Sequence, residues 1–274
     1  MKILIAGCAG QLGRSLVAAL VNDEVQGADR DRLDITRLAD VRQAITTFTP
    51  DLVINSAAYN DVDGAESNTA QAYRINALGP RNLALATAAA GIPLLHVSTD
   101  YVFDGAADRP YHEFDLPRPL SAYGLSKLAG EIAVKELNCR HYIVRTAWLF
   151  HPAGRNFLKT MRSLSQRPQV KAVSDQYGSP TYAPHLAQAI SELIRSEAYG
   201  VYHLAGQGGA SRFELTRMLF CSLGLETEVV PVSHAEFPAP APRPHNSVLT
   251  TAQEPAIVLP PWQEGVRAYA RALR

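Results

Sequence analysis

The sequence predicts an α/β protein built on a doubly wound parallel sheet, and two features of its N-terminal half indicate this. The first is an alternation of short apolar runs with segments of helical period, the pattern of successive strand–helix units. The apolar runs that suit strands span residues 2–6, 25–29, 51–55 and 93–97. The second feature is a glycine-rich turn that joins the first run to a helical pattern over residues 14–20. We therefore expect ligands to bind at the carboxyl edge of the sheet.

Composition and charge exclude several classes of function. The chain has 274 residues with 26 basic and 26 acidic side chains, so it offers no strongly charged surface to nucleic acid or membrane. No apolar run approaches the roughly 18 residues of a membrane span, and the N-terminus begins as a strand rather than as a signal peptide. Three cysteines, at positions 8, 139 and 221, lack the spacing of metal ligands. We expect reduced cysteines that pack in the interior, no metal site and a cytoplasmic protein.

The glycine-rich turn predicts a dinucleotide site. Its spacing is G-x-x-G-x-x-G, and it stands between a strand and a helix, where backbone amides at the helix N-terminus can face a pyrophosphate. In this context we expect a Rossmann-like domain rather than a mere tight turn. The turn residues expected to bind the cofactor are Gly7, Gly10, Gln11, Leu12 and Gly13.

The second apolar run ends in residues that bear on the choice of cofactor. Asp29 follows Gly7 by 22 residues, close to the roughly 20 expected for a carboxylate on the adenosine ribose, which favours NADH. Arg30 beside it could instead hold the 2′-phosphate of NADPH, so the sequence leaves both cofactors open. Asp34, followed by Ile35, is either a further cofactor contact or an acid that caps the next helical pattern.

Small and hydroxyl residues follow the third and fourth apolar runs. Ala57, Ala58 and Tyr59 come after the third run and leave room for a ligand, so we expect them beside the cofactor. Ser98 and Thr99 end the fourth run. The hydroxyl of Thr99 is placed to bond a substrate carbonyl, although both hydroxyls could also satisfy local backbone groups.

Tyr123 and Lys127 form the clearest catalytic pair. Four residues apart on a predicted helix, they share one face about a turn apart. A phenol with an ordinary pKa of roughly 10 gives up its proton poorly near neutrality unless a cation lowers that pKa, and Lys127 could be the cation. The alternative is an ordinary solvated pair, and the motif alone does not decide between them.

The two halves of the chain differ in organisation. Residues 1–150 hold the predicted dinucleotide-binding domain, and residues 151–274 mainly form a smaller α/β lobe for the substrate, with the chain free to cross back to the first domain. Helical patterns of this second half cover residues 156–164, 184–196 and 213–223, and a short strand is expected at 200–204. The proline-rich residues 238–244 should lie extended across the surface.

These motifs together resemble the extended short-chain dehydrogenase/reductase superfamily. Longer strings are similar to its dTDP-4-dehydrorhamnose reductase family, and the resemblance covers nearly the whole chain. The strings that carry it are Gly10-Gln11-Leu12-Gly13, Ala57-Ala58-Tyr59, the stretches 98–105, 145–150 and 175–181, and Arg243-Pro244-x-x-Ser247.

The resemblance implies an activity and a set of roles. NADPH or NADH would reduce the C4 ketone of dTDP-4-dehydro-L-rhamnose, with Tyr123 as proton donor and Thr99 orienting the ketone. Lys127 would hold the nicotinamide ribose and depress the pKa of Tyr123. A homodimer is compatible with this resemblance. The residues that it places at the substrate are Asp100, Tyr101 and Trp148, with Asn156 and Arg243 as candidate donors to the diphosphate.

Alternative functions remain open at this stage. The substrate could be another 4-keto sugar nucleotide, or the chain could be a non-catalytic regulatory subunit like the methionine adenosyltransferase β subunit. A sugar-nucleotide epimerase or a 4,6-dehydratase shares the scaffold, but dehydratases commonly carry Glu where this chain has Tyr101. The chain also departs from the reductase pattern at Arg212 and Phe213, where an aromatic pair usually follows Ser211. The Ser211-x-x-Glu214 spacing still predicts a capping box.

Overall fold

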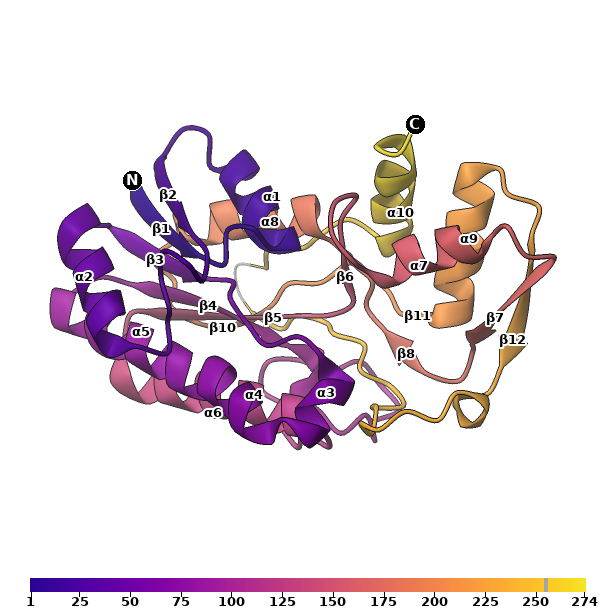
Figure 1. Cartoon of the computed structure of the whole chain (residues 1–274), viewed down its shortest axis with the longest axis horizontal. Coiled ribbons are helices and arrows are strands. Elements are labelled where there is room, and N and C mark those ends of the chain that lie inside the picture. The colour runs from indigo at the N-terminus through magenta and orange to yellow at the C-terminus, as the bar shows by residue number, and fades with distance from the viewer. Residues whose placement is uncertain (254–255) are drawn as a thin grey trace.

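A six-stranded parallel sheet forms the larger part of the molecule (Figure 1). The computed structural model describes residues 1–253 and 256–274. The strand order is β10-β5-β4-β3-β1-β2, and it reverses direction at β1, which confirms the doubly wound α/β prediction. The strands are β1 (Lys2–Ala6), β2 (Glu24–Ala28), β3 (Leu52–Asn55), β4 (Leu94–Thr99), β5 (His141–Thr146) and β10 (Gly200–His203).

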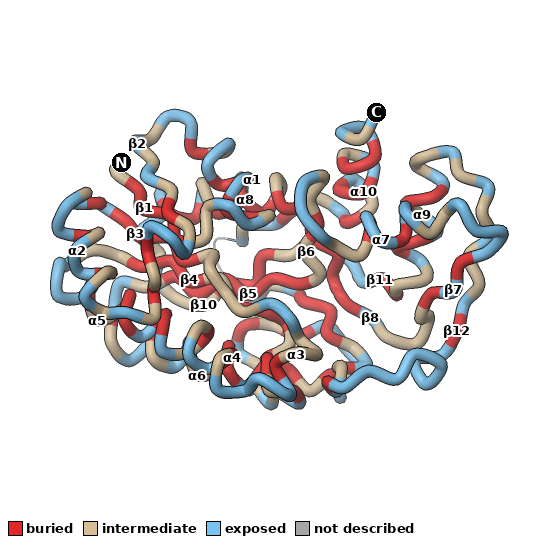
Figure 2. The backbone as a smooth tube through the Cα atoms, viewed as in Figure 1, coloured by how far each residue is buried: buried red, intermediate tan, exposed pale blue. Residues whose placement is uncertain are grey.

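Helices cover both faces of this sheet because its central strands are apolar on both sides. The residues of β1 and β3 alternate between two buried clusters, one on each face. One face packs against α1 (Gln11–Ala19) and α8 (Ala183–Leu193), and the other against α2 (Leu38–Phe48), α5 (Gly79–Ala90) and α6 (Ala122–Leu137). Figure 2 shows the buried residues concentrated along the sheet between these layers. The carboxyl ends of the strands are therefore the open edge.

The chain beyond residue 150 contributes to both parts of the molecule. α8 packs on α1, and β10 pairs in parallel with β5, with Val201 opposite Ile143. The remaining elements build a smaller lobe with its own apolar core, seen on the right of Figure 1. They are α7 (Phe157–Leu164), α9 (Arg212–Leu223), α10 (Trp262–Arg271), the parallel pair β7 (Gln169–Val173) and β12 (Glu228–Val232), and the short strands β6 (Leu149–Phe150), β8 (Tyr177–Gly178), β9 (Thr181–Tyr182) and β11 (Ala210–Ser211).

The sequence also predicts one long helical region from residue 63 to residue 90, with Asn76 inside it. In the structure this region is divided into four pieces. α3 (Val62–Ser67) ends at Asn68, whose backbone leaves the helical region before α4 (Thr69–Tyr73) begins. A π-helical segment, η1 (Arg74–Leu78), then precedes α5. The wider π turn is common at functional sites, and here it contains Asn76, which is buried.

The exposure of the cysteines corrects one expectation. Cys139 and Cys221 are exposed, so the expectation that they pack in the interior was wrong, and Cys8 is partly buried. Within residues 1–253 and 256–274, no helix is both long and apolar enough to cross a membrane. The same residues contain no cluster of three or more His, Cys, Asp or Glu side chains that could hold a metal ion.

Candidate active site

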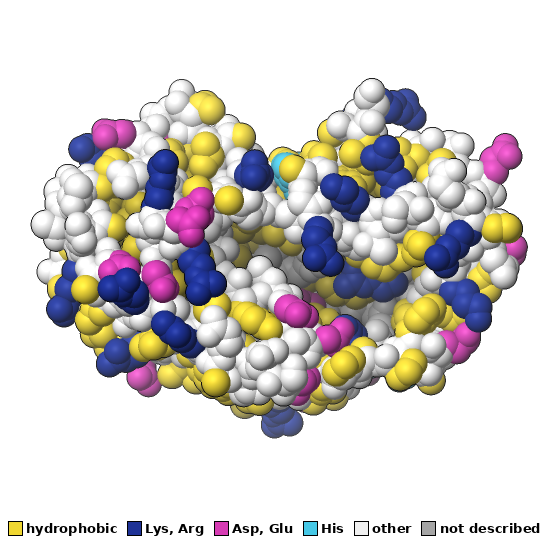
Figure 3. Space-filling view, viewed as in Figure 1, with side chains coloured by type: hydrophobic (Ala, Val, Ile, Leu, Met, Phe, Trp, Pro, Cys, Tyr) yellow, Lys and Arg dark blue, Asp and Glu magenta, His cyan; other side chains and the backbone are white. Residues whose placement is uncertain are grey.

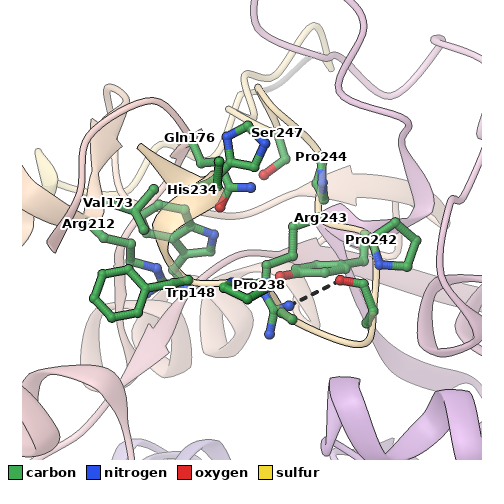
Figure 4. A pocket seen from close by; sticks show the side chains of 15 residues that line it. Trp148, Val173, Gln176, Arg212, His234, Pro238, Pro242, Arg243, Pro244 and Ser247 are labelled. Atoms are coloured by element: carbon green, nitrogen blue, oxygen red, sulfur yellow. Dashed lines mark hydrogen bonds between the residues drawn. The ribbon is translucent and has the colours of Figure 1, made fainter. Parts of the chain in front are cut away.

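Three cavities follow the carboxyl edge of the sheet and continue between the sheet and the smaller lobe. We call them the N-terminal cavity, of about 350 Å³ and lined by Gly7, Asp29 and Arg30, and the central cavity, of about 380 Å³ and lined by Thr99 and Tyr123. The outer cavity, of about 650 Å³, lies against the smaller lobe (Figure 4). Figure 3 shows the molecule hollowed between its two parts, with basic side chains in and along the hollow.

The glycine-rich turn lies where the N-terminal and central cavities approach each other. Gly7 has a φ of 81°, and a Cβ there would lie 2.7 Å from the backbone N of Ala57, so only glycine allows the ends of β1 and β3 to approach this closely. α1 begins directly after the turn. Its first residues line the central cavity, where Gly10, Gln11, Leu12 and Gly13 were expected to bind the cofactor.

The N-terminal cavity gathers the other residues expected to bind the cofactor. Arg74, from η1, also lines it, and nothing in the sequence singled that residue out. Asp34 accepts hydrogen bonds from the backbone N (2.9 Å) and hydroxyl (2.7 Å) of Thr36, and the hydroxyl bond holds its pKa below the ordinary value. These bonds close a turn before α2 and do not cap that helix, whose N-cap is Arg37 without a side-chain bond, so the capping alternative was wrong. The expected residues in this cavity are Gly7, Asp29, Arg30, Asp34, Ile35, Ala57, Ala58 and Tyr59.

Asn76 explains how the loop after β3 is held. Its side chain accepts from the backbone N of Tyr59 (2.8 Å) and donates to the carbonyl of the same residue (3.1 Å). It also donates to the hydroxyl of Ser126 on α6 (3.0 Å). Asn76 therefore satisfies the backbone of Tyr59 beside the N-terminal cavity, and it ties this loop to the helix that carries Tyr123 and Lys127.

Helix α6 brings Tyr123 and Lys127 to the central cavity. Ser121 caps the helix by accepting from the backbone N of Gly124 (3.1 Å), so the first turn delivers Tyr123. Both side chains line the central cavity and are nonetheless almost fully buried, as is Thr99 at the end of β4. The ammonium of Lys127 donates to the carbonyl of Val97 (2.6 Å). The three residues expected to be catalytic thus lie in one cavity.

The electrostatics of this pair differ from the expectation. Burial raises the pKa of Tyr123, although its contact with the Thr99 hydroxyl lowers it in part. This direction is opposite to the depression expected from Lys127. The burial of Tyr123 itself is the main cause. The ammonium of Lys127 donates to the carbonyl of Val97, and burial lowers the pKa of Lys127 to about 8. The phenol of Tyr123 is therefore protonated at neutral pH, as a proton donor must be.

Thr99 and Asp100 form a local hydrogen-bond network under the same cavity. The Thr99 hydroxyl donates to Asp100 (3.1 Å) and accepts from the backbone N of Tyr101 (3.2 Å). Ser247, from the Arg243-Pro244-x-x-Ser247 string, donates to the other carboxylate oxygen of Asp100 (2.6 Å). Burial raises the pKa of Asp100 to about 6. Thr99 therefore makes the local bonds named as one alternative while still facing the cavity.

Trp148 lies at the junction of the central and outer cavities in an unusual backbone conformation. Its φ is 44°, a region that bulky side chains seldom adopt and that costs on the order of 1–3 kcal/mol. Gly178 makes room for the indole, since a Cβ at that position would lie 2.4 Å from Cε2 of Trp148. Strain of this kind is often retained at functional sites. The indole lines both cavities, as does Tyr101.

The two side chains expected to bind a diphosphate already have partners. Asn156 caps α7 and also donates to the Gln11 side-chain oxygen (3.1 Å), which ties the glycine-rich turn to the smaller lobe. Arg243 pairs with both carboxylate oxygens of Asp63 (2.9 and 3.1 Å). Asn156 lines the central cavity and Arg243 the outer one, so neither is distant from the site.

Arg212, like Arg74, is a site residue that the sequence did not assign to the site. The predicted capping box is present, with the Ser211 hydroxyl accepting from the backbone N of Glu214 (3.1 Å), so α9 begins at Arg212. The guanidinium carbon lies 3.6 Å from the ring centroid of Trp148 and 4.7 Å from that of Phe157. The only signal in the sequence was the departure from an aromatic pair at this position.

The fold and the site define a Rossmann-like protein of the short-chain dehydrogenase/reductase class. The model of the family described as RmlD substrate binding domain matches residues 1–274. A dTDP-4-dehydrorhamnose reductase of Mycobacterium tuberculosis is 43% identical over 99% of this chain and 92% of that relative. The chain belongs to this family, the dTDP-4-dehydrorhamnose reductases, which confirms the resemblance.

Two solved structures of the same family superpose closely. The dTDP-4-dehydrorhamnose reductase of Clostridium acetobutylicum gives a TM-score of 0.97 with 42% identity, covering 100% of this chain and 99% of that one. The enzyme of that name from Bacillus anthracis, solved in complex with NADP, gives a TM-score of 0.96 with 39% identity, covering 99% of both chains.

Proposed function

We propose that this protein reduces the C4 ketone of dTDP-4-dehydro-L-rhamnose to the alcohol of dTDP-L-rhamnose, with NADPH as the preferred reductant. The observation that carries this is the meeting of Thr99, Tyr123 and Lys127 in one cavity beside the glycine-rich turn, in a chain of this family. The NADP of the Bacillus anthracis relative supports the choice of cofactor.

The residues present fit a dinucleotide. The N-terminal and central cavities share Ala58 and Asn60, so together they offer one extended site along the sheet edge. Gln11 and Leu12, in the first turn of α1, line the central cavity, where the backbone N–H groups of a helix N-terminus can face the pyrophosphate. Arg30 and Arg74 are the cations for a 2′-phosphate. When bound, the reduced nicotinamide supplies the hydride that adds to C4.

The chain's own residues would complete the reduction. Thr99 orients the ketone oxygen, and the phenol of Tyr123 gives its proton to the alkoxide that forms when the hydride reaches C4. Lys127 holds the ribose and stabilises the phenolate that is left. The phenolate then regains a proton from solvent. Each ketone reduced therefore consumes one hydride, which forms the C–H bond, and one proton, which forms the O–H bond.

The direct test uses enzymatically generated dTDP-4-dehydro-L-rhamnose. The protein is mixed with NADPH and then with NADH, the loss of reduced-nicotinamide absorbance is followed, and the product sugar is identified. Formation of dTDP-L-rhamnose, faster with NADPH, is the expected result. Binding of the dinucleotide without oxidation would overturn the proposal and favour another 4-keto sugar or the regulatory-subunit function.

Cofactor choice gives the first prediction. Arg30→Ala should raise the KM for NADPH about 10-fold or more and leave the KM for NADH nearly unchanged, because a charge-assisted hydrogen bond to the 2′-phosphate is lost. Steady-state kinetics with both cofactors measures this. Arg32→Ala is the matched control, since Arg32 is not among the residues that line the N-terminal cavity and its loss should leave both values unchanged. An equal rise for the two cofactors would remove Arg30 from 2′-phosphate recognition.

The pH dependence gives the second prediction. The pKa of Lys127 is lowered to about 8 by burial, so its ammonium is present below that pH and is lost above it. We expect kcat/KM for NADPH, which reports the free enzyme, to fall above pH of about 8. In Lys127→Arg, whose guanidinium stays charged, this fall should disappear even if the plateau is lower. Lys135→Arg, on the exposed side of α6, is the control and should show the same fall of kcat/KM as the unaltered protein. An unchanged fall in Lys127→Arg would mean that another group titrates.

A further inference from the structure

Arg212 is a cation in the site that makes no direct polar contact with the described residues, and the charge of Asp100 acts on it only through space. No hydrogen bond or ion pair joins its guanidinium to any side chain or carbonyl of residues 1–253 or 256–274. Its guanidinium carbon lies 3.6 Å from the ring centroid of Trp148, and a guanidinium held over an aromatic ring keeps the N–H groups at its edge available to an anion. Figure 4 shows both residues among those that line the outer cavity. Burial lowers the pKa of Arg212 only to about 10, so the group is charged at neutral pH.

The other basic side chains of the outer cavity already have acidic partners. Arg243 is paired with Asp63 (2.9 Å), and His234 contacts Asp175 (2.9 Å). Among the described residues that line this cavity none is acidic. An anion that enters it therefore meets Arg212 as the cation with free donors.

The position of Arg212 indicates which part of a ligand it meets. Tyr101, Trp148 and Arg212 line both the central and the outer cavity, so they mark the passage between them. If the sugar ketone lies at Thr99 and Tyr123, the nucleoside must extend into the outer cavity, and the diphosphate that joins them must cross this passage. The diphosphate is also the part of such a ligand that carries negative charge.

We propose that Arg212 binds the diphosphate of the nucleotide sugar and so selects a nucleoside diphosphate over the bare nucleoside. This inference rests on the proposed function, because it takes the sugar ketone to lie beside Tyr123. Arg212 stands at a position where the reductases that this chain resembles usually have an aromatic residue. Arg212 is then a specificity-determining residue, and Trp148 is the surface that holds its guanidinium in the plane needed for two parallel bonds to phosphate oxygens.

The test compares thymidine diphosphate with thymidine on the protein saturated with NADP. Isothermal titration calorimetry should show that Arg212→Gln weakens thymidine diphosphate binding about 10- to 100-fold and changes thymidine binding less than about 2-fold. The affinity of the unaltered protein for the diphosphate should fall with added salt, and this dependence should be smaller in Arg212→Gln. Arg217→Gln, an exposed arginine on the same helix, is the matched control and should leave both affinities unchanged.

Two results would overturn the inference. One is thymidine diphosphate binding in Arg212→Gln as tight as in the unaltered protein. The other is an equal loss for thymidine and its diphosphate, which would make Arg212 a packing partner of Trp148. Arg212→Lys, which keeps the charge, separates the two roles. It should restore diphosphate binding if the charge of Arg212 binds the diphosphate, and should not restore it if Arg212 only packs on Trp148. Turnover of the unaltered protein is measured beside these, so absence of ketone reduction with intact diphosphate selectivity would overturn the proposed function alone.

Discussion

Tyr123→Phe should lower kcat for reduction of the 4-keto sugar nucleotide by about 10²- to 10⁴-fold, the usual contribution of a positioned proton donor. The phenol is the group that meets the new alkoxide, and burial keeps it protonated at neutral pH by raising its pKa. Phenylalanine keeps the ring that packs edge-to-face on Tyr101, with centroids 5.7 Å apart. Removal of the hydroxyl should therefore change the chemistry and not the packing.

The measurement combines turnover with cofactor binding. The Kd of Tyr123→Phe for NADPH, read from quenching of tryptophan fluorescence, should stay within about 3-fold of the unaltered value, because the Gly7 turn and the N-terminal cavity are intact. Tyr199→Phe is the control. Tyr199 packs on Tyr142 and lines none of the three cavities, so this variant should turn over normally. Unchanged turnover in Tyr123→Phe would remove it as the acid.

The parts of the site that the sequence predicted are those in which spacing along the chain fixes spacing in space. Gly7 and Gly13 lie in one turn, Tyr123 and Lys127 lie on one helix, and Thr99 ends a parallel strand, so local periodicity was enough to place them. The fold followed from the same patterns. The break of the 63–90 region at Asn68 was missed, because an isolated asparagine within a helical pattern carries no local sign that tertiary packing will end the helix there.

Other properties depend on contacts between distant segments and could not be read from the sequence. Arg212 reaches Trp148, 64 positions earlier in the chain, only because the fold brings the start of α9 beside the residues that follow β5. The rise in the pKa of Tyr123 depends on how deeply α6 is buried, which is a property of the whole core. Arg243, the cation expected to bind a diphosphate, forms an ion pair with Asp63 of α3, 180 positions earlier in the chain.

A buried ion pair below the central cavity joins the three elements that carry the proposed catalytic residues. Glu131 on α6 accepts from Arg145 on β5 at 2.7 and 2.9 Å, and from the hydroxyl of Ser98 on β4 at 2.6 Å. Glu131 and Arg145 are at most 1% exposed. Since Thr99 follows Ser98 and Lys127 precedes Glu131 by one helical turn, this pair sets the distance between the hydroxyl of β4 and the face of α6.

Arg145→Met should lower the free energy of unfolding by about 3–5 kcal/mol, because it leaves the carboxylate of Glu131 buried without its partner. Urea denaturation at pH 7 measures the loss. Arg37→Met, which removes an exposed arginine 3.6 Å from Asp40, should change the same quantity by less than about 1 kcal/mol. The double variant Glu131→Leu/Arg145→Met should be more stable than Arg145→Met, since it removes the uncompensated charge as well.

The pH dependence separates the loss of charge pairing from a mere loss of packing. Burial acts to raise the pKa of Glu131, but the hydrogen bonds and charge of Arg145 hold it below the ordinary value. In the unaltered protein this pair therefore stabilises the fold above the unfolded pKa and loses its effect as pH falls through the lower folded pKa. In Arg145→Met burial acts unopposed by that partner, so Glu131 takes up a proton more readily, and the stability gap to the unaltered protein should narrow from pH 7 to pH 5. A gap that is constant over this range would mean that the stability of this region comes from the packing of Arg145 on Phe103 rather than from its charge.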